Sequence, residues 1–184
     1  MKDIADHIFD ILENSITANA TEIEVIIKFF KKQFFCQIKD NGKGIKNENA
    51  IDAFVTSRKE RKVGLGLPLL KRTVEETGGF LKVSKLKKSG TMLEFTINFS
   101  HIDSKPFGSL SKTFVDAMIC WPEVKIEVLI EIKENKKVNI FNNRKIMQII
   151  NYSELQKKEI RNFICCSIDQ ELEKIGIDTQ FGKY

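Results

Sequence analysis

The feature that most constrains the fold of this chain is a change of apolar periodicity, from helical to strand-like, which occurs twice within the first hundred residues. In some segments large apolar side chains recur every three or four residues, as in a helix. These segments alternate with runs rich in Ile, Val and Phe, which are typical of strands. The pattern predicts a helix over 3–18, strands over 22–30 and 33–39, a short helix near 47–53, a helix from Leu65 to Thr77, and strands over 80–86 and 91–99. We therefore expect an α+β fold: a two-layer sandwich in which helices cover one face of a mixed sheet.

The composition of the chain changes after Ser100. The segment Ser104-Lys105-Pro106-Phe107-Gly108 has the character of a linker, so we expect one domain over residues 1–100 and a small α+β region over 101–184. The second region is predicted to contain a helix near 109–119, a hairpin over 124–141, and helical segments near 143–150 and 153–175. Its last helix has an apolar stripe, which is either a core face or a dimer face; the stripe is Ile160, Phe163, Ile164, Ile168, Leu172 and Ile175.

Bulk properties exclude several classes of protein. The 184 residues are 42% hydrophobic and 30% charged, which is typical of a soluble globular protein. No apolar run approaches the ~20 residues of a membrane span, and the N-terminus has acidic residues where a signal peptide needs basic ones, so we expect a cytoplasmic protein without membrane insertion. The net charge of +5 comes without a basic stripe interleaved with aromatic residues, which disfavours nucleic-acid binding. The four cysteines form no CxxC pair, so we expect buried or half-buried residues rather than a zinc site.

Two short polar patterns near the start of the chain can perform chemistry. Asp10 and Asn14 are four residues apart and share one face of the first predicted helix, where a carboxylate and an amide can hold magnesium and orient a water. Asp40 ends a predicted strand and is followed by Gly42 and Gly44, so it can accept a hydrogen bond from an adenine amine while the glycines let the base approach the backbone. Taken alone, the first pattern equally fits a solvated helix face, and the second fits a tight turn.

A third pattern points to phosphate. Gly64-Leu65-Gly66 precedes a predicted helix, and the free N–H groups of a helix N-terminus bind phosphate. A glycine pair before a helix can also serve packing only. Just ahead of it lies a basic run over residues 58–62, which is either an ordinary solvated loop or a cation cluster for a triphosphate.

The order of these motifs resembles that of the GHKL ATPase superfamily, which includes histidine kinase catalytic domains, MutL-type mismatch-repair ATPases, type II topoisomerase ATPase domains and the heat-shock chaperone ATPase. Residues 10–21 are similar to its N box, closest to the MutL form, and Asp40-Asn-Gly-Lys-Gly-Ile45 is similar to its G1 box. Residues 63–71 resemble the G2 box of histidine kinases, and residues 89–95 resemble the late strand whose threonine helps to bind adenine. The resemblance covers residues 1–99 and implies a Bergerat-type fold that binds ATP with Mg²⁺.

The resemblance also implies individual roles. Asn14 is expected to ligate magnesium, and Asp40 to accept from the adenine amine, directly and through a water shared with Thr91. The residues implied to bind the nucleotide are Asp40, Gly42, Gly44, Ile45, Thr56, Arg58, Lys62, Gly64, Leu65, Gly66 and Thr91. Asp10 stands where ATP-hydrolysing members often have Glu as the general base, and because its side chain is shorter we expect slow hydrolysis.

Three functions fit this reading. The chain is a kinase that passes the γ-phosphate of ATP to a partner protein in signalling, an ATP-dependent switch with slow hydrolysis, or a module that only binds nucleotide. Nine residues precede Asp10, so we expect no phosphoacceptor hairpin, and we expect His7 to be a helix-surface or capping residue; His101 is given the same reading. ATP or ADP and a partner protein are the expected ligands, and a homodimer is left open.

Overall fold

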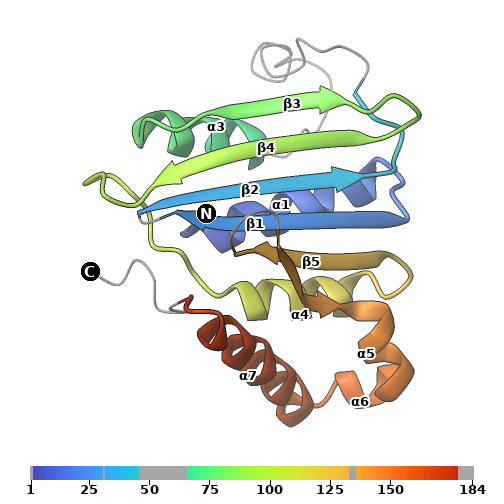
Figure 1. Cartoon of the computed structure of the whole chain (residues 1–184). Helices are drawn as coiled ribbons and strands as arrows, with labels where there is room; N and C mark the ends of the chain where they lie inside the picture. Colours follow the sequence, from blue (N-terminus) through green and yellow to red (C-terminus); the bar gives the residue numbers. More distant parts are fainter. Residues whose placement is uncertain (1, 31, 46–65, 133–135, 178–184) are drawn as a thin grey trace.

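A mixed six-stranded sheet organises the chain in the computed structural model, which describes residues 2–30, 32–45, 66–132 and 136–177 (Figure 1). The helices are α1 (Ile4–Thr17), α3 (Gly66–Glu76), α4 (Leu110–Cys120), α5 (Asn143–Ile149), α6 (Tyr152–Leu155) and α7 (Lys158–Lys174). The strands are β1 (Glu22–Phe30), β2 (Gln33–Asp40), β3 (Leu81–Lys85), β4 (Thr91–Asn98), β5 (Lys125–Glu131) and β6 (Lys137–Asn142), in the spatial order β3-β4-β2-β1-β5-β6.

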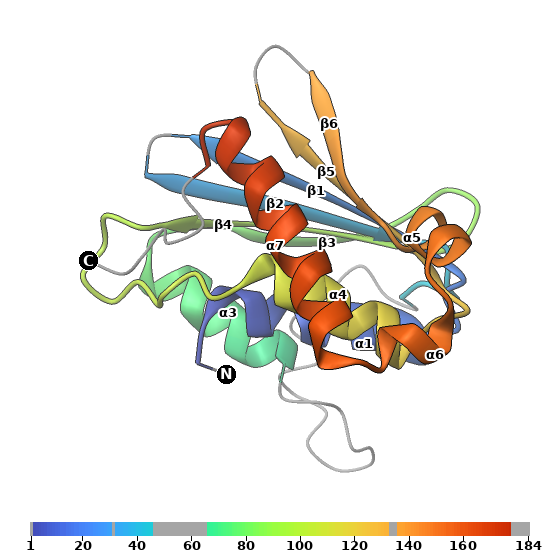
Figure 2. The same ribbon diagram turned by 90° about the horizontal axis from the view of Figure 1, so that it is seen from below.

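One parallel pairing makes the sheet mixed. Strand β1 pairs antiparallel with β2 and parallel with β5, and the other neighbouring strands are antiparallel. Helices α1, α3 and α4 lie on the same side of the sheet (Figure 2). The predicted two-layer α+β sandwich is therefore confirmed, with element bounds close to those expected. The helical segment expected over 153–175 is divided into α6 and α7, and the helix expected near 47–53 lies outside the described residues.

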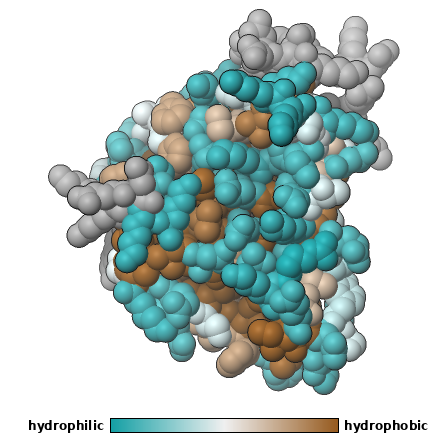
Figure 3. Space-filling view, turned by 45° about the vertical axis from the view of Figure 1, so that its right-hand side comes forward, coloured by the Kyte–Doolittle hydropathy of each residue, from teal (hydrophilic) through white to brown (hydrophobic). Residues whose placement is uncertain are grey.

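The core lies between the sheet and the helices. Along β2 the burial alternates strictly, so that Phe34, Cys36 and Ile38 face the helices and the residues between them are half-buried. Helix α1 presents Ile8 and Leu12 to the same core, and each such fully buried side chain contributes roughly 1.5–3 kcal/mol to stability. The apolar patches that do reach the surface are separated by hydrophilic side chains (Figure 3).

The segment expected to be a linker is instead part of this core. The backbone N–H of Ile4 donates to the carbonyl of Pro106 at 3.1 Å, and that of Ala5 donates to Phe107 at 2.9 Å. The ring of Phe107 is 3% exposed and packs against the rings of Phe29, Phe34 and Phe99, with ring centroids 5.5, 5.1 and 5.8 Å away, respectively. The linker prediction is wrong because burial of the Phe107 ring anchors this Pro/Gly segment in the core. The division of the chain at residue 100 stays a prediction; in the structure both parts share one sheet and one core.

The last helix resolves the alternatives left open for its apolar stripe. Ile164, Ile168 and Leu172 are buried, and α7 packs on α4 and β6, so this part of the stripe is a core face. Phe163 is 67% exposed, so it is not part of that core face, and the dimer alternative stays a prediction for it. Two cysteines also differ from expectation: Cys120 and Cys166 are exposed. Within the described ranges, no helix has both the length and the apolarity needed to cross a membrane.

Candidate functional site

The carboxylate of Asp40 is the polar centre of the site. Asp40 is the last residue of β2, and its side chain points to the helix-covered side of the sheet, where the residue is only 7% exposed. Its Oδ1 accepts from the backbone N–H groups of Gly42 at 2.9 Å and Thr91 at 3.3 Å, and its Oδ2 accepts from the hydroxyl of Ser15 at 3.2 Å. A carboxylate has about four acceptor positions. The described donors fill three of them, so Oδ2 can accept one further hydrogen bond.

Two glycines let the loop after β2 and the β3–β4 turn meet backbone to backbone. Gly90 has a φ of +99°, and a Cβ added there would lie 1.8 Å from the carbonyl oxygen of Asp40. Gly44 has a φ of +71°, and a Cβ there would lie 2.9 Å from the carbonyl oxygen of Gly90. This contact places the N–H of Thr91 beside Asp40. Thr91 was predicted to act through its side chain, whereas in the described structure it is the backbone N–H of Thr91 that contacts Asp40.

The C-terminus of α1 anchors the same loop. The backbone N–H of Lys43 donates to the carbonyl of Ala18 at 2.9 Å, and a Cβ on Gly42 would lie 2.7 Å from that oxygen. The side chain of Asn41 accepts from the backbone N–H groups of Thr21 at 2.8 Å and Glu22 at 3.0 Å. Ile45 is partly buried against the core. The loop is thus fixed to α1 and β1, so Asp40 and Gly42 have a defined position.

Asp10 lies where α1 meets the start of α3. A Cβ on Gly66, the first residue of α3, would lie 2.6 Å from Oδ2 of Asp10. Burial raises the pKa of Asp10, and the charges of Glu13 and Asp6 raise it further. A raised pKa makes this carboxylate a stronger proton acceptor, which suits a general base. Asn14 is exposed one turn further along α1, on the same helix face as Asp10.

Comparison with known proteins identifies the family of this chain. The sequence matches the model of the histidine kinase-, DNA gyrase B-, and HSP90-like ATPase family over residues 2–101, which is more than half of the chain. The chain belongs to this family. It is thus a GHKL ATPase-like domain, as the motif order predicted. A comparison with curated proteins gives no match.

Three solved structures are similar to this GHKL domain at low identity, and the first two share its fold. The ATPase domain of Aquifex aeolicus MutL complexed with ADP is 16% identical, with a TM-score of 0.51, and the match covers 89% of this chain and 87% of that one. The N-terminal domain of a DNA repair protein is 17% identical, with a TM-score of 0.50, covering 85% of this chain and 55% of that one. The catalytic domain of the histidine kinase ThkA is 19% identical over 50% of this chain and 63% of its own, with a TM-score of 0.40. The chain thus spans less than two thirds of two of these relatives. The 89% coverage extends beyond the family match, so part of the C-terminal region shares the fold of the MutL domain.

A magnesium ion shared with a nucleotide would need only one or two ligands from this chain. Within the described residues there is no cluster of three or more His, Cys, Asp or Glu that could hold a metal alone. Magnesium in nucleotide sites is typically held by one or two protein oxygens together with phosphates and waters. The amide oxygen of the exposed Asn14 is a ligand of that type.

Several predicted nucleotide contacts lie outside the described residues. These are Thr56, Arg58, Lys62, Gly64 and Leu65. The described structure shows two groups of contacts beside α1: Asp40 with Gly42 and Thr91, and Asp10 with Gly66. Gly44 contacts the β3–β4 turn, and Asn14 lies on α1 without a described contact to either group. Ser15 and Gly90 were not predicted, although Ser15 follows Asn14 in the N box and Gly90 precedes Thr91.

His7 differs most from its prediction. It was expected on the helix surface or at a cap, but it is fully buried, because α3 and the segment after β4 cover this side of α1. Its Nε2 lies 3.2 Å from Oγ1 of Thr73 and 3.5 Å from Nζ of Lys105. Burial, followed by the charge of Lys105, lowers the pKa of His7 to about 4. His101, by contrast, is exposed, as predicted for a surface residue, and its Nδ1 lies 3.6 Å from Oδ2 of Asp103.

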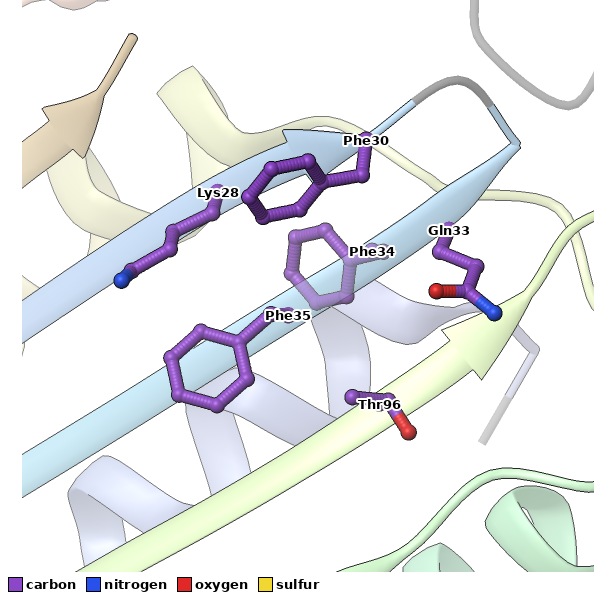
Figure 4. A pocket seen from close by; sticks show the side chains of 6 residues that line it. All are labelled: Lys28, Phe30, Gln33, Phe34, Phe35 and Thr96. Carbon is purple, nitrogen blue, oxygen red and sulfur yellow. The ribbon is translucent and has the colours of Figure 1, made fainter. Parts of the chain in front are cut away.

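Two hollows on the molecule lie at different distances from this chemistry. One, of about 240 Å³, is on the sheet near the β1–β2 hairpin and contains no predicted site residue (Figure 4). Its lining is Lys28, Phe30, Gln33, Phe34, Phe35 and Thr96. The other, of about 590 Å³, is a groove between α1 and α4 whose lining includes Asp10. Only the groove adjoins a residue of the candidate site.

Proposed function

We propose that this GHKL domain binds ATP with Mg²⁺ and uses Asp40 to recognise the adenine. The observation that supports this most strongly is the state of the Asp40 carboxylate, which is buried, held by three described donors, and able to accept one more. The exocyclic amine of adenine is a donor of the required kind. The ADP complex of the MutL domain, which has the same fold, supports a nucleotide as the ligand.

The phosphates are proposed to lie toward the start of α3. The N-terminus of a helix offers free N–H groups to an anion, and Gly66 occupies that place beside Asp10. Gly64 and Leu65, with Thr56, Arg58 and Lys62, are proposed to complete the contacts. Bound magnesium would neutralise phosphate charge, with Asn14 as its protein ligand.

Asp10 is proposed as the general base. Its carboxylate has a raised pKa and lies one helical turn from Asn14, so it can accept a proton from a nucleophile close to the phosphates. The outcome we favour is transfer of the γ-phosphate to a partner protein in signalling or regulation, or slow hydrolysis. A nucleotide-dependent switch with little catalysis is the second candidate, and the short side chain of Asp10 favours it.

The experiment is incubation of the purified protein with γ-labelled ATP and Mg²⁺, alone and with cell lysate. Label in free phosphate indicates hydrolysis, label in another protein indicates transfer, and binding without either product indicates a switch or module. Asp10→Asn should reduce product formation at least about 10-fold while nucleotide binding remains. Glu13→Gln is the comparison variant: it removes one of the charges that raise the pKa of Asp10 but keeps the Asp10 carboxylate, so it should reduce product formation much less than Asp10→Asn. Equal loss in both variants would remove Asp10 from its proposed role.

A further inference from the structure

We propose that His7 is a positioning residue, which fixes α1 on α3 through Thr73 and so holds Asp10 against the first residue of α3. The proposal rests on the proposed function, since it concerns how the proposed general base is placed. It assigns a role to a buried polar group that the nucleotide site does not itself use.

The two helix contacts are linked by a short, rigid piece of α1. His7 meets Thr73 in the second half of α3, and three residues later Asp10 meets Gly66 at the start of α3. The two helices therefore run in opposite directions past each other. Less than one turn of helix separates His7 from Asp10. A shift of α1 along α3 at His7 is accordingly transmitted to the carboxylate of Asp10.

The hydrogen bond from Thr73 to Leu69 favours one direction for the bond between Thr73 and His7. The hydroxyl of Thr73 donates to the carbonyl of Leu69 at 3.0 Å, so its oxygen is left to accept from His7. We therefore assign Nε2–H as the donor, that is, the neutral tautomer protonated at Nε2. The lowered pKa of His7 is consistent with a neutral ring at pH 7. Lys105, 3.5 Å from the same nitrogen, acts through its charge rather than as a donor to it.

A buried polar side chain at position 7 is unfavourable for stability, which argues that His7 does more than fill space in the core. Nδ1 of His7 is buried and has no hydrogen-bond partner within the described residues. A buried group without a partner is destabilising, so among the described residues an apolar side chain would suit this position better on stability alone. Apolar contacts are non-directional and tolerate sliding. The Nε2–H bond to Thr73 supplies a direction that the neighbouring Ile4 and Ile8 do not.

The test compares His7→Leu, His7→Gln and Thr73→Val with the wild type. For each variant we would measure urea unfolding, kcat and KM for Mg-ATP turnover, and the carboxyl pKa of Asp10 by NMR without nucleotide. In His7→Leu we expect unchanged or higher stability, kcat at least 10-fold lower with KM within about 2-fold, and a pKa of Asp10 that moves toward the ordinary value. His7→Gln, which retains an N–H donor, should recover part of both changes, and the effects of His7→Leu and Thr73→Val should not add.

The readouts separate the possible failures. If kcat and the pKa of Asp10 are both unchanged in a folded His7→Leu variant, the positioning role is wrong. A fall in stability with proportional loss of every readout, and no recovery in His7→Gln, would make His7 a packing residue and also overturn the proposal. If the wild type neither binds nor turns over ATP, the proposed function fails. The pKa of Asp10 then still decides whether His7 positions it.

Discussion

Replacement of Gly90 by alanine should damage stability and nucleotide binding together. Two costs add in the folded state. The φ of +99° is one that L-residues adopt at a cost of roughly 1–2 kcal/mol. The new Cβ would also lie 1.8 Å from the carbonyl oxygen of Asp40, and relieving such overpacking typically costs about 1–3 kcal/mol. The expected loss in the free energy of unfolding is therefore about 2–5 kcal/mol.

The backbone must move to relieve that overlap, and the next residue is the one that donates to Asp40. The bond from the N–H of Thr91 to Oδ1 should lengthen or break, so the affinity for ATP should fall as well. Gly78→Ala is the matched control. Gly78 also has a positive φ, +66°, but nothing lies within 4 Å of the added Cβ, so we expect a loss of only about 1 kcal/mol and normal binding.

The assay is urea unfolding followed by circular dichroism, together with an ATP titration of each folded variant. The comparison isolates the steric contact, because the chemical change is the same in both variants. If Gly90→Ala is as mild as Gly78→Ala, or binds ATP as the wild type does, then the β3–β4 turn does not support the site in the way that we infer.

Three further predictions follow from single residues. His7 has a pKa of 6.5 in the unfolded chain and about 4 in the folded one, so the unfolded state binds more protons between these pH values. The free energy of unfolding should therefore fall by about 3 kcal/mol as the pH is lowered from 6.5 to 4. His7→Leu should remove this part of the pH dependence of unfolding. Phe107→Ala should cost about 3–5 kcal/mol in urea unfolding, as for a core residue, whereas a linker residue would cost under about 0.5 kcal/mol. Ser15→Ala removes the donor to Oδ2 of Asp40 and should cost about 1–3 kcal/mol; an unchanged unfolding curve would show that this bond contributes nothing.

Local patterns predicted most of the elements. The apolar periodicity of α1, the hairpins and the helix before Gly78 arises from short-range constraints, so their bounds could be read within a few residues. The parallel pairing of β5 with β1 could not, because it joins segments about a hundred residues apart and depends on packing of the whole core.

The sequence predicted the motifs of the site but not how the residues around it pack. Asp40 and Gly42 follow from a motif that is contiguous in sequence, and the structure brings them together with Thr91. The burial of His7 depends on α3 and Lys105, which are distant in sequence, and helical spacing alone does not say which flank of α1 a neighbour covers. Phe107 was misread for the same reason, since only the tertiary fold places its ring in the core.

Calorimetric titration of the wild type and Asp40→Asn with Mg-ATP tests adenine recognition most directly. In the variant, Oδ1 can keep both backbone donors and the hydroxyl of Ser15 can rotate to accept from the new amide, so the unfolding free energy should change by less than about 1 kcal/mol. The adenine amine would instead meet a donor. We expect the wild type to bind in the micromolar-to-millimolar range, ~4–8 kcal/mol, and the variant to bind about 10- to 100-fold more weakly. Equal affinity of the two folded proteins would contradict the account.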